Sequence, residues 1–368
     1  MPGKTDIFII GGGPAGLATA IAARQRGFEV VVADGAAPPI DKPCGEGLMP
    51  DGINALSRLG ITVPENDSYP FRGIRFLSGG VEVDASFPRG TGIGIRRTIL
   101  HRSMINAAER AGVTLLWKTP VSGLDSESVQ VGSQRLRSRW IIGADGGQSL
   151  VQQWVGLDRY TFDQMRFAFR RHYRIAPWSD CMELYWGPKC QIYVTPVAAD
   201  EICVALISRQ SDLRLDHALQ AFPQLLSRLH GAEPASAERG AISCTRKLRR
   251  VYAGNVVLVG DASGAVDAIT GEGLCLSFSQ AELLAECLLT GNLERYQREH
   301  RNLAMRPTLM AKLILTLDWK ASFRQRVMKA FSSNPRLFAR MLAVHVGALP
   351  AGKIAGLGLS LGWKFLHV

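Results

Sequence analysis

Residues 6–34, DIFIIGGGPAGLATAIAARQRGFEVVVAD, decide how the fold begins. The apolar run Asp6–Ile10 predicts a β-strand, the glycine-rich segment after it predicts a tight turn, and a helix is expected to continue to about Arg26. A second apolar strand, Phe28–Ala33, then ends at Asp34. A strand, a helix and a strand in this order form one βαβ unit.

The glycines of this turn follow the spacing GxGxxG. Gly11 permits the tight turn, Gly13 lets backbone amides approach a pyrophosphate, and Gly16 allows the helix to pack closely on the strand. The N-terminus of the helix then faces the phosphates. Asp34 is expected to accept hydrogen bonds from the adenosine ribose hydroxyls, and the alternative is a surface acid at a strand end. The predicted dinucleotide site comprises Gly11, Gly13, Pro14, Ala15, Gly16 and Asp34.

The composition excludes several classes of protein. The chain has 368 residues, of which 46% are hydrophobic, a formal net charge of +11 and seven cysteines. Such a chain buries a sizeable core, which excludes a disordered protein, and its length favours two folded units. The scattered cysteines and histidines show no ligand spacing, so neither a disulfide scaffold nor a metal site is expected. The sequence has no secretory segment, so we expect a cytoplasmic protein.

The order of the predicted elements indicates an α/β (α+β) protein with two interwoven domains. Strands, a hairpin and helices alternate without a repeat or a low-complexity linker, which favours a second domain inserted between pieces of the first. The first domain is Rossmann-like, the second is built on an antiparallel sheet, and the end of the chain is helical. The predicted ranges are 1–72, 95–160 and 250–300 for the dinucleotide-binding domain, 73–94 and 161–249 for the substrate-binding domain, and 301–368 for the C-terminal helical region.

Two further glycine and aspartate segments lie far downstream of the first. One is Gly143-Ala144-Asp145-Gly146, and the other is Val259-Gly260-Asp261-Ala262, which is followed by Thr270-Gly271-Glu272-Gly273. In this order, over about residues 5–290, the sequence resembles the flavoprotein family of p-hydroxybenzoate hydroxylase, geranylgeranyl reductases and flavin-dependent halogenases. The resemblance implies that the dinucleotide is FAD.

The same resemblance assigns cofactor contacts. The Asp at the place of Asp261 binds the ribityl and pyrophosphate part of FAD, and the helix opened by Gly271–Leu274 points its amides at the flavin, where negative charge is stabilised. Arg97 is implied to reach the cofactor. Gln152 or Gln153 stands where the family usually has Arg, so the electron donor stays open between NADPH, NADH and a protein donor. The implied FAD contacts are Arg97, Asp145, Gly260, Asp261, Gly271, Glu272, Gly273 and Leu274.

The segment Lys42-Pro43-Cys44-Gly45-Glu46-Gly47-Leu48 resembles the Cys-Gly-Gly-Gly-Leu segment that lies against the flavin in geranylgeranyl reductases. This adds Cys44 and Gly45 to the implied cofactor contacts. A thiol beside a flavin can relay a proton, whereas a free cysteine is more often a small buried apolar residue. Glu46 and Glu272 are flanked by glycine and are candidate acids or bases, with a surface carboxylate as the alternative. Cys44 and Glu46 are the predicted catalytic residues.

The middle of the chain, about residues 161–250, has strands rich in aromatic residues. In the resembled fold the substrate lies between the flavin and this sheet, so these side chains either line an apolar pocket or pack in the core. Only Pro196 and an aromatic residue at Tyr193 match the corresponding runs of geranylgeranyl reductases and halogenases. The predicted pocket residues are Phe169, Tyr185, Tyr193 and Pro196.

The positive charge of the chain is concentrated at its end. Residues 301–368 hold eleven Lys and Arg but a single acid, Asp318. Apolar residues there recur on one helical face, and no uninterrupted apolar span is long enough to cross a bilayer. Stacking aromatics with base-reading groups are missing, so nucleic acid is not an expected partner. This region is expected either to dock peripherally on a membrane or to cap the substrate domain.

Together these patterns predict a FAD-dependent monooxygenase. By resemblance, reduced flavin captures O2 as a C4a-hydroperoxide, which hydroxylates an apolar aromatic or polyketide-like substrate of secondary metabolism. The alternative is a geranylgeranyl-reductase-like alkene reductase of a lipophilic substrate, favoured by Cys44 and by the basic end of the chain. Minor alternatives are a flavin-dependent halogenase and a non-catalytic flavoprotein. The expected partners are an apolar small molecule and O2.

Overall fold

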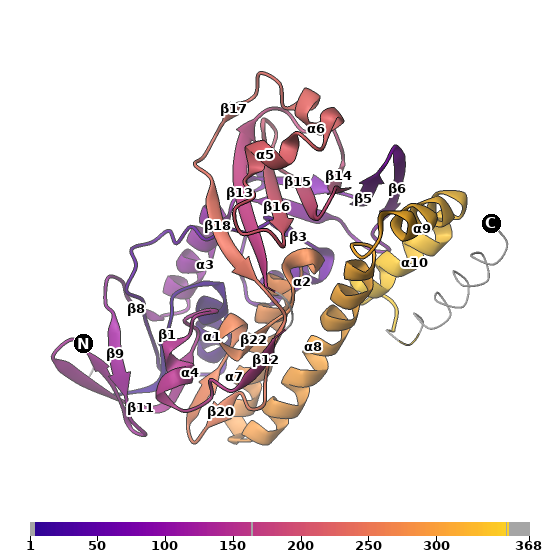
Figure 1. The fold of residues 1–368 in the computed structure, drawn as a ribbon. Coiled ribbons are helices and arrows are strands. Elements are labelled where there is room, and N and C mark those ends of the chain that lie inside the picture. Colours follow the sequence, from indigo (N-terminus) through magenta and orange to yellow (C-terminus); the bar gives the residue numbers. More distant parts are fainter. Residues whose placement is uncertain (1–3, 163–164, 351, 353–368) are drawn as a thin grey trace.

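The structure is a computed structural model that describes residues 4–162, 165–350 and 352. Figure 1 shows a sheet that begins with the N-terminal strand, a second sheet above it, and three C-terminal helices along one side. The predicted α/β fold, with a Rossmann-like part, an antiparallel sheet and a helical C-terminal region, is confirmed.

The first sheet carries the glycine-rich turn. Its central strands are parallel in the order β21-β11-β1-β2-β8, β20 is an antiparallel edge strand, and β9 and β10 extend β11. Strand β2 is buried throughout, since helices cover both faces of a parallel sheet. The bounds are β1 Lys4–Ile10, β2 Val30–Ala33, β8 Thr114–Leu116, β9 Val121–Leu124, β10 Ser128–Val131, β11 Gln134–Gly143, β20 Tyr252–Ala253 and β21 Val256–Leu258.

Helix α1 (Pro14–Arg24) follows β1 directly and packs against α7 (Gly273–Thr290). Nine of the eleven residues of α1 are buried, which is why the helix is apolar on all sides. The pairing of α1 with α7 brings two of the predicted glycine segments together at the helix N-termini. The other helices of this part are α2 Pro50–Arg58, α3 Arg97–Arg110 and α4 Leu150–Trp154.

The second sheet has the order β17-β13-β16-β15-β14-β5-β6, with β18 also pairing with β13. Its neighbouring strands are antiparallel except β14 and β5, which run parallel and join segments about a hundred residues apart in sequence. The bounds are β5 Gly73–Ser78, β6 Val81–Ser86, β13 Arg166–Arg174, β14 Cys181–Trp186, β15 Cys190–Ala198, β16 Glu201–Ser208, β17 Glu233–Pro234 and β18 Arg239–Ser243.

Two small antiparallel sheets, β3-β7-β4 and β12-β19-β22, and three short 3-10 helices complete the two parts. Strand β3 belongs to the Cys44 segment, so this segment is held by backbone hydrogen bonds to β7. The bounds are β3 Gly47–Leu48, β4 Ser68–Phe71, β7 Gly92–Ile95, β12 Tyr160–Phe162, β19 Arg246–Leu248, β22 Gly264–Ala265, η1 Glu65–Asp67, η2 Gly260–Ser263 and η3 Ala268–Thr270.

The C-terminal helices α8 (Leu293–Thr316), α9 (Ala321–Ser333) and α10 (Pro335–His345) cover one face of the second sheet. The ring of Phe338 lies 4.9 Å from that of Phe76 on β5 and 5.3 Å from that of Phe331 on α9. The helices therefore act as a cap, one of the two roles expected for this region. Helix α8 runs without interruption through position 301, where the C-terminal region was expected to begin.

One predicted helix is divided in the structure. The sequence predicts a single helix near Leu213–His230, but the structure has α5 (Leu215–Leu219) and α6 (Pro223–Arg228). Pro223 begins α6 because it lacks an amide hydrogen and is best tolerated in the first helical turn.

Candidate functional site

The turn between β1 and α1 needs glycine for two reasons. Gly11 has φ +114°, and a Cβ there would lie 2.4 Å from the carbonyl oxygen of Ala144. A Cβ on Gly16 would lie 1.9 Å from the carbonyl oxygen of Gly11, so packing requires both glycines. At Gly13 no described atom lies within 4 Å of an added Cβ. This open backbone at the start of α1, where Pro14 and Ala15 form the first turn, fits an approaching pyrophosphate.

Asp34 lies at the end of β2 and holds the glycine turn. Its Oδ2 accepts a hydrogen bond from the Gly12 amide at 2.7 Å, and its Oδ1 accepts one from the Ala36 amide at 2.8 Å. His101 holds the turn from α3. Its Nδ1 accepts from the Ile40 amide, so Nε2 carries the proton and donates to the Gly12 carbonyl oxygen at 2.7 Å. Burial lowers the pKa of His101, which keeps the ring neutral in this role. Sequence reasoning missed His101, although it lies four residues after Arg97.

Asp145 caps helix α4. Its Oδ1 accepts from the Ser149 hydroxyl at 2.6 Å, and its Oδ2 accepts from the amides of Leu150 and Val151 at 2.7 and 3.1 Å. Both carboxylate oxygens are therefore occupied by the start of the helix. If Asp145 contacts the cofactor as predicted, one of these oxygens would have to accept from the cofactor and from α4 at the same time.

The segment with Asp261 follows β21 and meets the glycine turn. Gly260 has φ +62°, and a Cβ there would lie 2.5 Å from the Cβ of Ala15. The side chain of Asp261 is exposed, and its carbonyl oxygen accepts from Arg246 at 2.7 Å. Gln152, one of the two glutamines considered for the place of the family's Arg, is buried and donates to the carbonyl oxygen of Ala262. Gln152 thus links two of the cofactor segments.

The N-terminus of α7 holds a buried carboxyl group. Gly271 has φ +67°, Glu272 is the N-cap residue, and no described atom lies within 4 Å of a Cβ added to Gly273. Leu274 follows in the first turn. Glu272 Oε1 lies 3.1 Å from Nη2 of Arg306, but among the described residues neither carboxyl oxygen has a hydrogen-bond partner. Burial raises the pKa of Glu272 to about 8, which keeps the group protonated at neutral pH.

Arg306 of α8 joins three elements at this point. Besides Glu272 it contacts Asp51 of α2 at 3.2 Å, and its Nη1 donates to the carbonyl oxygen of His345 at 2.6 Å. Burial lowers the pKa of His345 to about 4, so this side chain is neutral. The C-terminal cap is therefore tied through one guanidinium group to the start of α7.

We expect the free energy of unfolding to depend on Glu272. An unfolded glutamate loses its proton near pH 4.5, whereas Glu272 keeps it to about pH 8. Between these values the folded protein binds more protons, so stability falls as pH rises. Glu272→Gln removes this titration and should stabilise the protein relative to wild type above pH 8 by a few kcal/mol, at about 1.4 kcal/mol per pKa unit. Urea unfolding of the two holoproteins at pH 5 and pH 8.5 measures the difference in their free energy of unfolding. The same difference at both pH values would contradict the raised pKa of Glu272.

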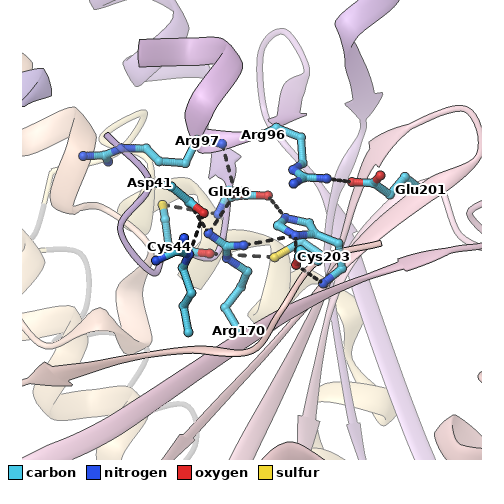
Figure 2. Close-up of polar contacts among 11 residues, drawn as sticks. Asp41, Cys44, Glu46, Arg96, Arg97, Arg170, Glu201 and Cys203 are labelled. Atoms are coloured by element: carbon cyan, nitrogen blue, oxygen red, sulfur yellow. Dashed lines mark hydrogen bonds and ion pairs between the residues drawn. The ribbon is translucent and has the colours of Figure 1, made fainter. Parts of the chain in front are cut away.

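The segment of Cys44 and Glu46 is anchored by a buried network between the two sheets (Figure 2). Glu46 has φ +59° and a side chain 1% exposed. Its Oε1 accepts from the amide of Arg97 at 2.9 Å, and its Oε2 lies 2.5 Å from Nε2 of His172 on β13. The Glu46 amide donates to the sulfur of Cys44 at 3.4 Å. Burial raises the pKa of Cys44, so this residue is a thiol at neutral pH.

The partners of His172 fix its proton. Nη1 of Arg170 lies 3.1 Å from Nδ1 of His172, and a guanidinium can only donate. Nδ1 therefore accepts, also facing the Ser236 hydroxyl at 2.8 Å, and Nε2 carries the proton that is donated to Glu46. Arg170 is 1% exposed and also pairs with Asp41 at 2.5 Å. The charges of Glu46 and Asp41 thus face one buried guanidinium.

Glu46, His172 and Cys203 offer three ligand atoms within 4.8 Å of one another, a combination that the sequence spacing did not predict. Nη2 of Arg170 lies 3.9 Å from Glu46 Oε1 and already supplies positive charge there. Burial raises the pKa of the Cys203 thiol well above its usual value. We describe these three groups as part of the ion-pair network around Arg170.

The described residues fit the FAD that the resemblance implies. The backbone is open at Gly13, Gly45 and Gly273, where no described atom lies within 4 Å of an added Cβ. Nε of Arg97 is buried, and within the described part of the chain it has no hydrogen-bond partner. Open glycine backbone at two helix N-termini together with an unpaired guanidinium nitrogen suits an anionic dinucleotide.

An apolar cavity lies between the second sheet and the C-terminal cap. Its free space is about 20 Å³, which is room for little more than one water molecule. Four methionines line it, Met49, Met182, Met310 and Met341. The remaining lining residues are Ile74, Phe76, Leu184, Tyr193, Ile269, Thr270, Ile314, Phe338, Leu342 and His345.

The predicted pocket residues fall on different sides of the second sheet. Tyr193 lines the cavity, and its hydroxyl donates to the carbonyl oxygen of Ile269 at 2.5 Å. Tyr185 lies in the core against α5 and α6, with its hydroxyl 2.6 Å from Glu183, and Phe169 stacks under Arg214 at 4.1 Å. Pro196 packs with its carbonyl oxygen against Gly94 of β7. Because side chains alternate along a strand, only one of the three aromatic residues faces the cavity.

Comparison with known proteins agrees with this geometry. The sequence model of the FAD binding domain family matches residues 4–305. Menaquinone reductase of Mycobacterium tuberculosis is 25% identical over 319 residues, which cover 79% of this chain and 78% of that protein. Digeranylgeranylglycerophospholipid reductase 1 of Methanothermobacter thermautotrophicus is 26% identical over 295 residues, 74% of this chain and 73% of that protein.

Two further similarities involve oxygen-using and halogenating enzymes. Para-nitrophenol 4-monooxygenase of a Pseudomonas species is 25% identical over 340 residues, which cover 80% of this chain and 82% of that enzyme. The solved structure of the flavin-dependent brominase Bmp2 superposes with a TM-score of 0.80 at 17% identity and covers 94% of each chain. At that identity the likeness concerns the fold alone. The protein is a FAD-dependent oxidoreductase, and the chain belongs to the FAD binding domain family.

Proposed function

We propose that the protein reduces a carbon–carbon double bond of an apolar, chain-like substrate. The observation that carries the proposal is the buried carboxyl group of Glu272, which lies beside the open backbone of Gly273 and two residues from Thr270 in the apolar cavity wall. Burial raises its pKa to about 8, as a proton donor at neutral pH requires. A reduction of this kind needs a weak acid that can donate a proton to carbon in a site that excludes water. The two relatives named as reductases of menaquinone and of a digeranylgeranyl lipid support it.

FAD, held at the open backbone of Gly13 and Gly273 and by Arg97, would supply hydride for one carbon of the double bond once reduced by NADPH or NADH. The electron pair of the double bond then takes the proton of Glu272 at the other carbon, and the product has gained two hydrogens. Arg306, 3.1 Å from Glu272, stabilises the carboxylate that is left. The thiol of Cys44 is the second candidate donor. The methionine side chains around the cavity would have to change rotamer to admit the apolar chain, because its free space is about 20 Å³.

Anaerobic turnover tests the proposal. Photoreduced holoenzyme is mixed in D2O with geranylgeraniol or menaquinone, without O2. We expect the flavin colour to return and the product to gain one solvent deuterium. Glu272→Gln should slow this step by about 10²-fold or more, whereas Cys44→Ser should have the smaller effect. Recovery of colour only after O2 is admitted, with no reduced product, would contradict the proposal.

A second candidate is hydroxylation of an apolar aromatic compound, the function that the sequence predicts first. It is favoured by the nitrophenol monooxygenase relative and by the aromatic rings of Phe76, Tyr193 and Phe338 in the cavity wall. The same experiment separates the two functions. Strict dependence on O2, with one atom of 18O2 found in the product, would select the monooxygenase.

A further inference from the structure

Helix α8 has an outer face that combines basic and apolar side chains. Arg298, Arg301, Met305, Leu309 and Lys312 follow one another at spacings of three or four residues and are all exposed, so they lie on one side of the helix. Met305 is 66% exposed and Leu309 37% exposed. The stripe ends at Trp319, which is 78% exposed just beyond the helix. We call these six residues the α8 stripe. Figure 1 shows α8 along the edge of the molecule.

A basic groove lies at the beginning of the stripe. Its volume is about 340 Å³, and four arginines line it, with Glu294 as its one acid. Gln297 also lines it, and its buried side-chain nitrogen has no hydrogen-bond partner in the part of the chain that the structure describes. Such a groove suits a phosphate group. The lining arginines are Arg249, Arg250, Arg298 and Arg301.

At the C-terminal end of the α8 stripe, the positive charge is not neutralised by an exposed acidic side chain. Asp318, the single acid after position 300, has a side chain 4% exposed and accepts from Gln191 at 2.7 Å. Lys320 lies over the ring of Trp319 with its nitrogen 5.7 Å from the ring centre. The stripe therefore combines exposed apolar side chains with cations, the pattern of a helix that lies in a membrane interface.

The opposite face of α8 reaches the interior. Met310 and Ile314 are buried and line the apolar cavity, so one helix separates the cavity from the stripe. No helix in residues 4–350 as described is long and apolar enough to cross a bilayer.

We propose that the α8 stripe and the basic groove dock the protein on the surface of an anionic phospholipid bilayer. The arginines bind lipid phosphates, and Met305, Leu309 and Trp319 insert between the head groups. The charge of the surface selects this occupant over a neutral partner. The inference does not depend on the reaction, because binding is measured without turnover.

Sedimentation of holoprotein with vesicles tests it. We expect binding to vesicles of phosphatidylcholine with 30% phosphatidylglycerol, little binding to pure phosphatidylcholine, and weaker binding at high salt. Arg250→Gln with Lys312→Gln should weaken binding about 25-fold, since each cation near an anionic surface contributes about fivefold. Met305→Ser with Leu309→Ser and Trp319→Ser should weaken it at least tenfold.

The control replaces one exposed apolar residue and one exposed arginine outside the α8 stripe and the basic groove. Ile242, 57% exposed on β18, and the exposed Arg159 are replaced as Ile242→Ser with Arg159→Gln, and this variant should bind like wild type. The flavin spectrum of each variant verifies its fold. Equal binding to both vesicle types, or stripe variants that bind like wild type, would overturn the proposal. So would a dimer that the Met305, Leu309 and Trp319 changes convert to monomer, because the face would then join two copies.

Discussion

A Gly16→Ala variant is expected to yield no flavin-loaded protein. The added Cβ would lie 1.9 Å from the carbonyl oxygen of Gly11, and 3.3 Å from the Cβ of Ala144. The first contact is with backbone, which cannot turn aside as a flexible side chain does. Helix α1 would have to move away from β1, and α7 packs on α1, so the displacement reaches two cofactor segments. Soluble yield and the ratio of flavin to protein absorbance measure the result.

Gly13→Ala serves as the matched control for this change. No described atom lies within 4 Å of its Cβ, so the variant should fold with an unchanged free energy of unfolding when FAD is removed. The new methyl group enters the space assigned to the cofactor, so FAD affinity should fall at least tenfold. A Gly16→Ala protein with a full complement of FAD would refute the packing argument, and an unchanged FAD affinity of Gly13→Ala would refute the placement of the pyrophosphate.

Glu46→Ala is expected to destabilise the holoprotein by about 3–5 kcal/mol at pH 7, the usual effect of removing one partner from a buried ion pair. Arg170 and His172 are 1% and 0% exposed, and both face the Glu46 carboxylate. Without it the guanidinium keeps Asp41 as its one nearby carboxylate among the described residues, and the Nε2 proton of His172 is buried without an acceptor. Urea unfolding with saturating FAD measures the loss.

Two further variants show whether the destabilisation comes from the buried charge of Glu46. Glu46→Gln keeps one oxygen as an acceptor and should lose less than Glu46→Ala. Glu201→Ala breaks the neighbouring ion pair with Arg96, whose side chains are 17% and 23% exposed, and should cost about 1 kcal/mol or less because solvent screens it. If Glu46→Ala is no more destabilising than Glu201→Ala, the buried network does not hold the Cys44 segment.

The sequence predicts the local parts of this molecule well. Each glycine segment carries its own conformational requirement, so the turn at Gly11–Gly16 and the start of α7 could be expected from neighbouring residues alone. Pro223 also indicates a helix start, and with it the division between α5 and α6, but the predicted single helix does not include this break. The apolar periodicity after position 301 indicated helices but could not decide what they cover.

The long-range partners could not be predicted in the same way. Glu46 meets His172 from 126 residues away, because β13 reaches the Cys44 segment only once the second sheet has formed. Arg306 meets Glu272 for a similar reason, since α8 must fold back along η3 and α7. Strand alternation also decided that Tyr193 faces the cavity and Tyr185 does not. Those choices depend on register and packing, which a single sequence does not reveal.

The four methionines around the cavity make the interior adaptable. An unbranched thioether changes rotamer at little cost, so the free space of about 20 Å³ can change its outline as the methionines move. The same lining is vulnerable to peroxide, which converts each thioether to a polar sulfoxide. Oxidation of these methionines would therefore make the cavity lining polar, while the visible absorbance of the bound flavin would remain.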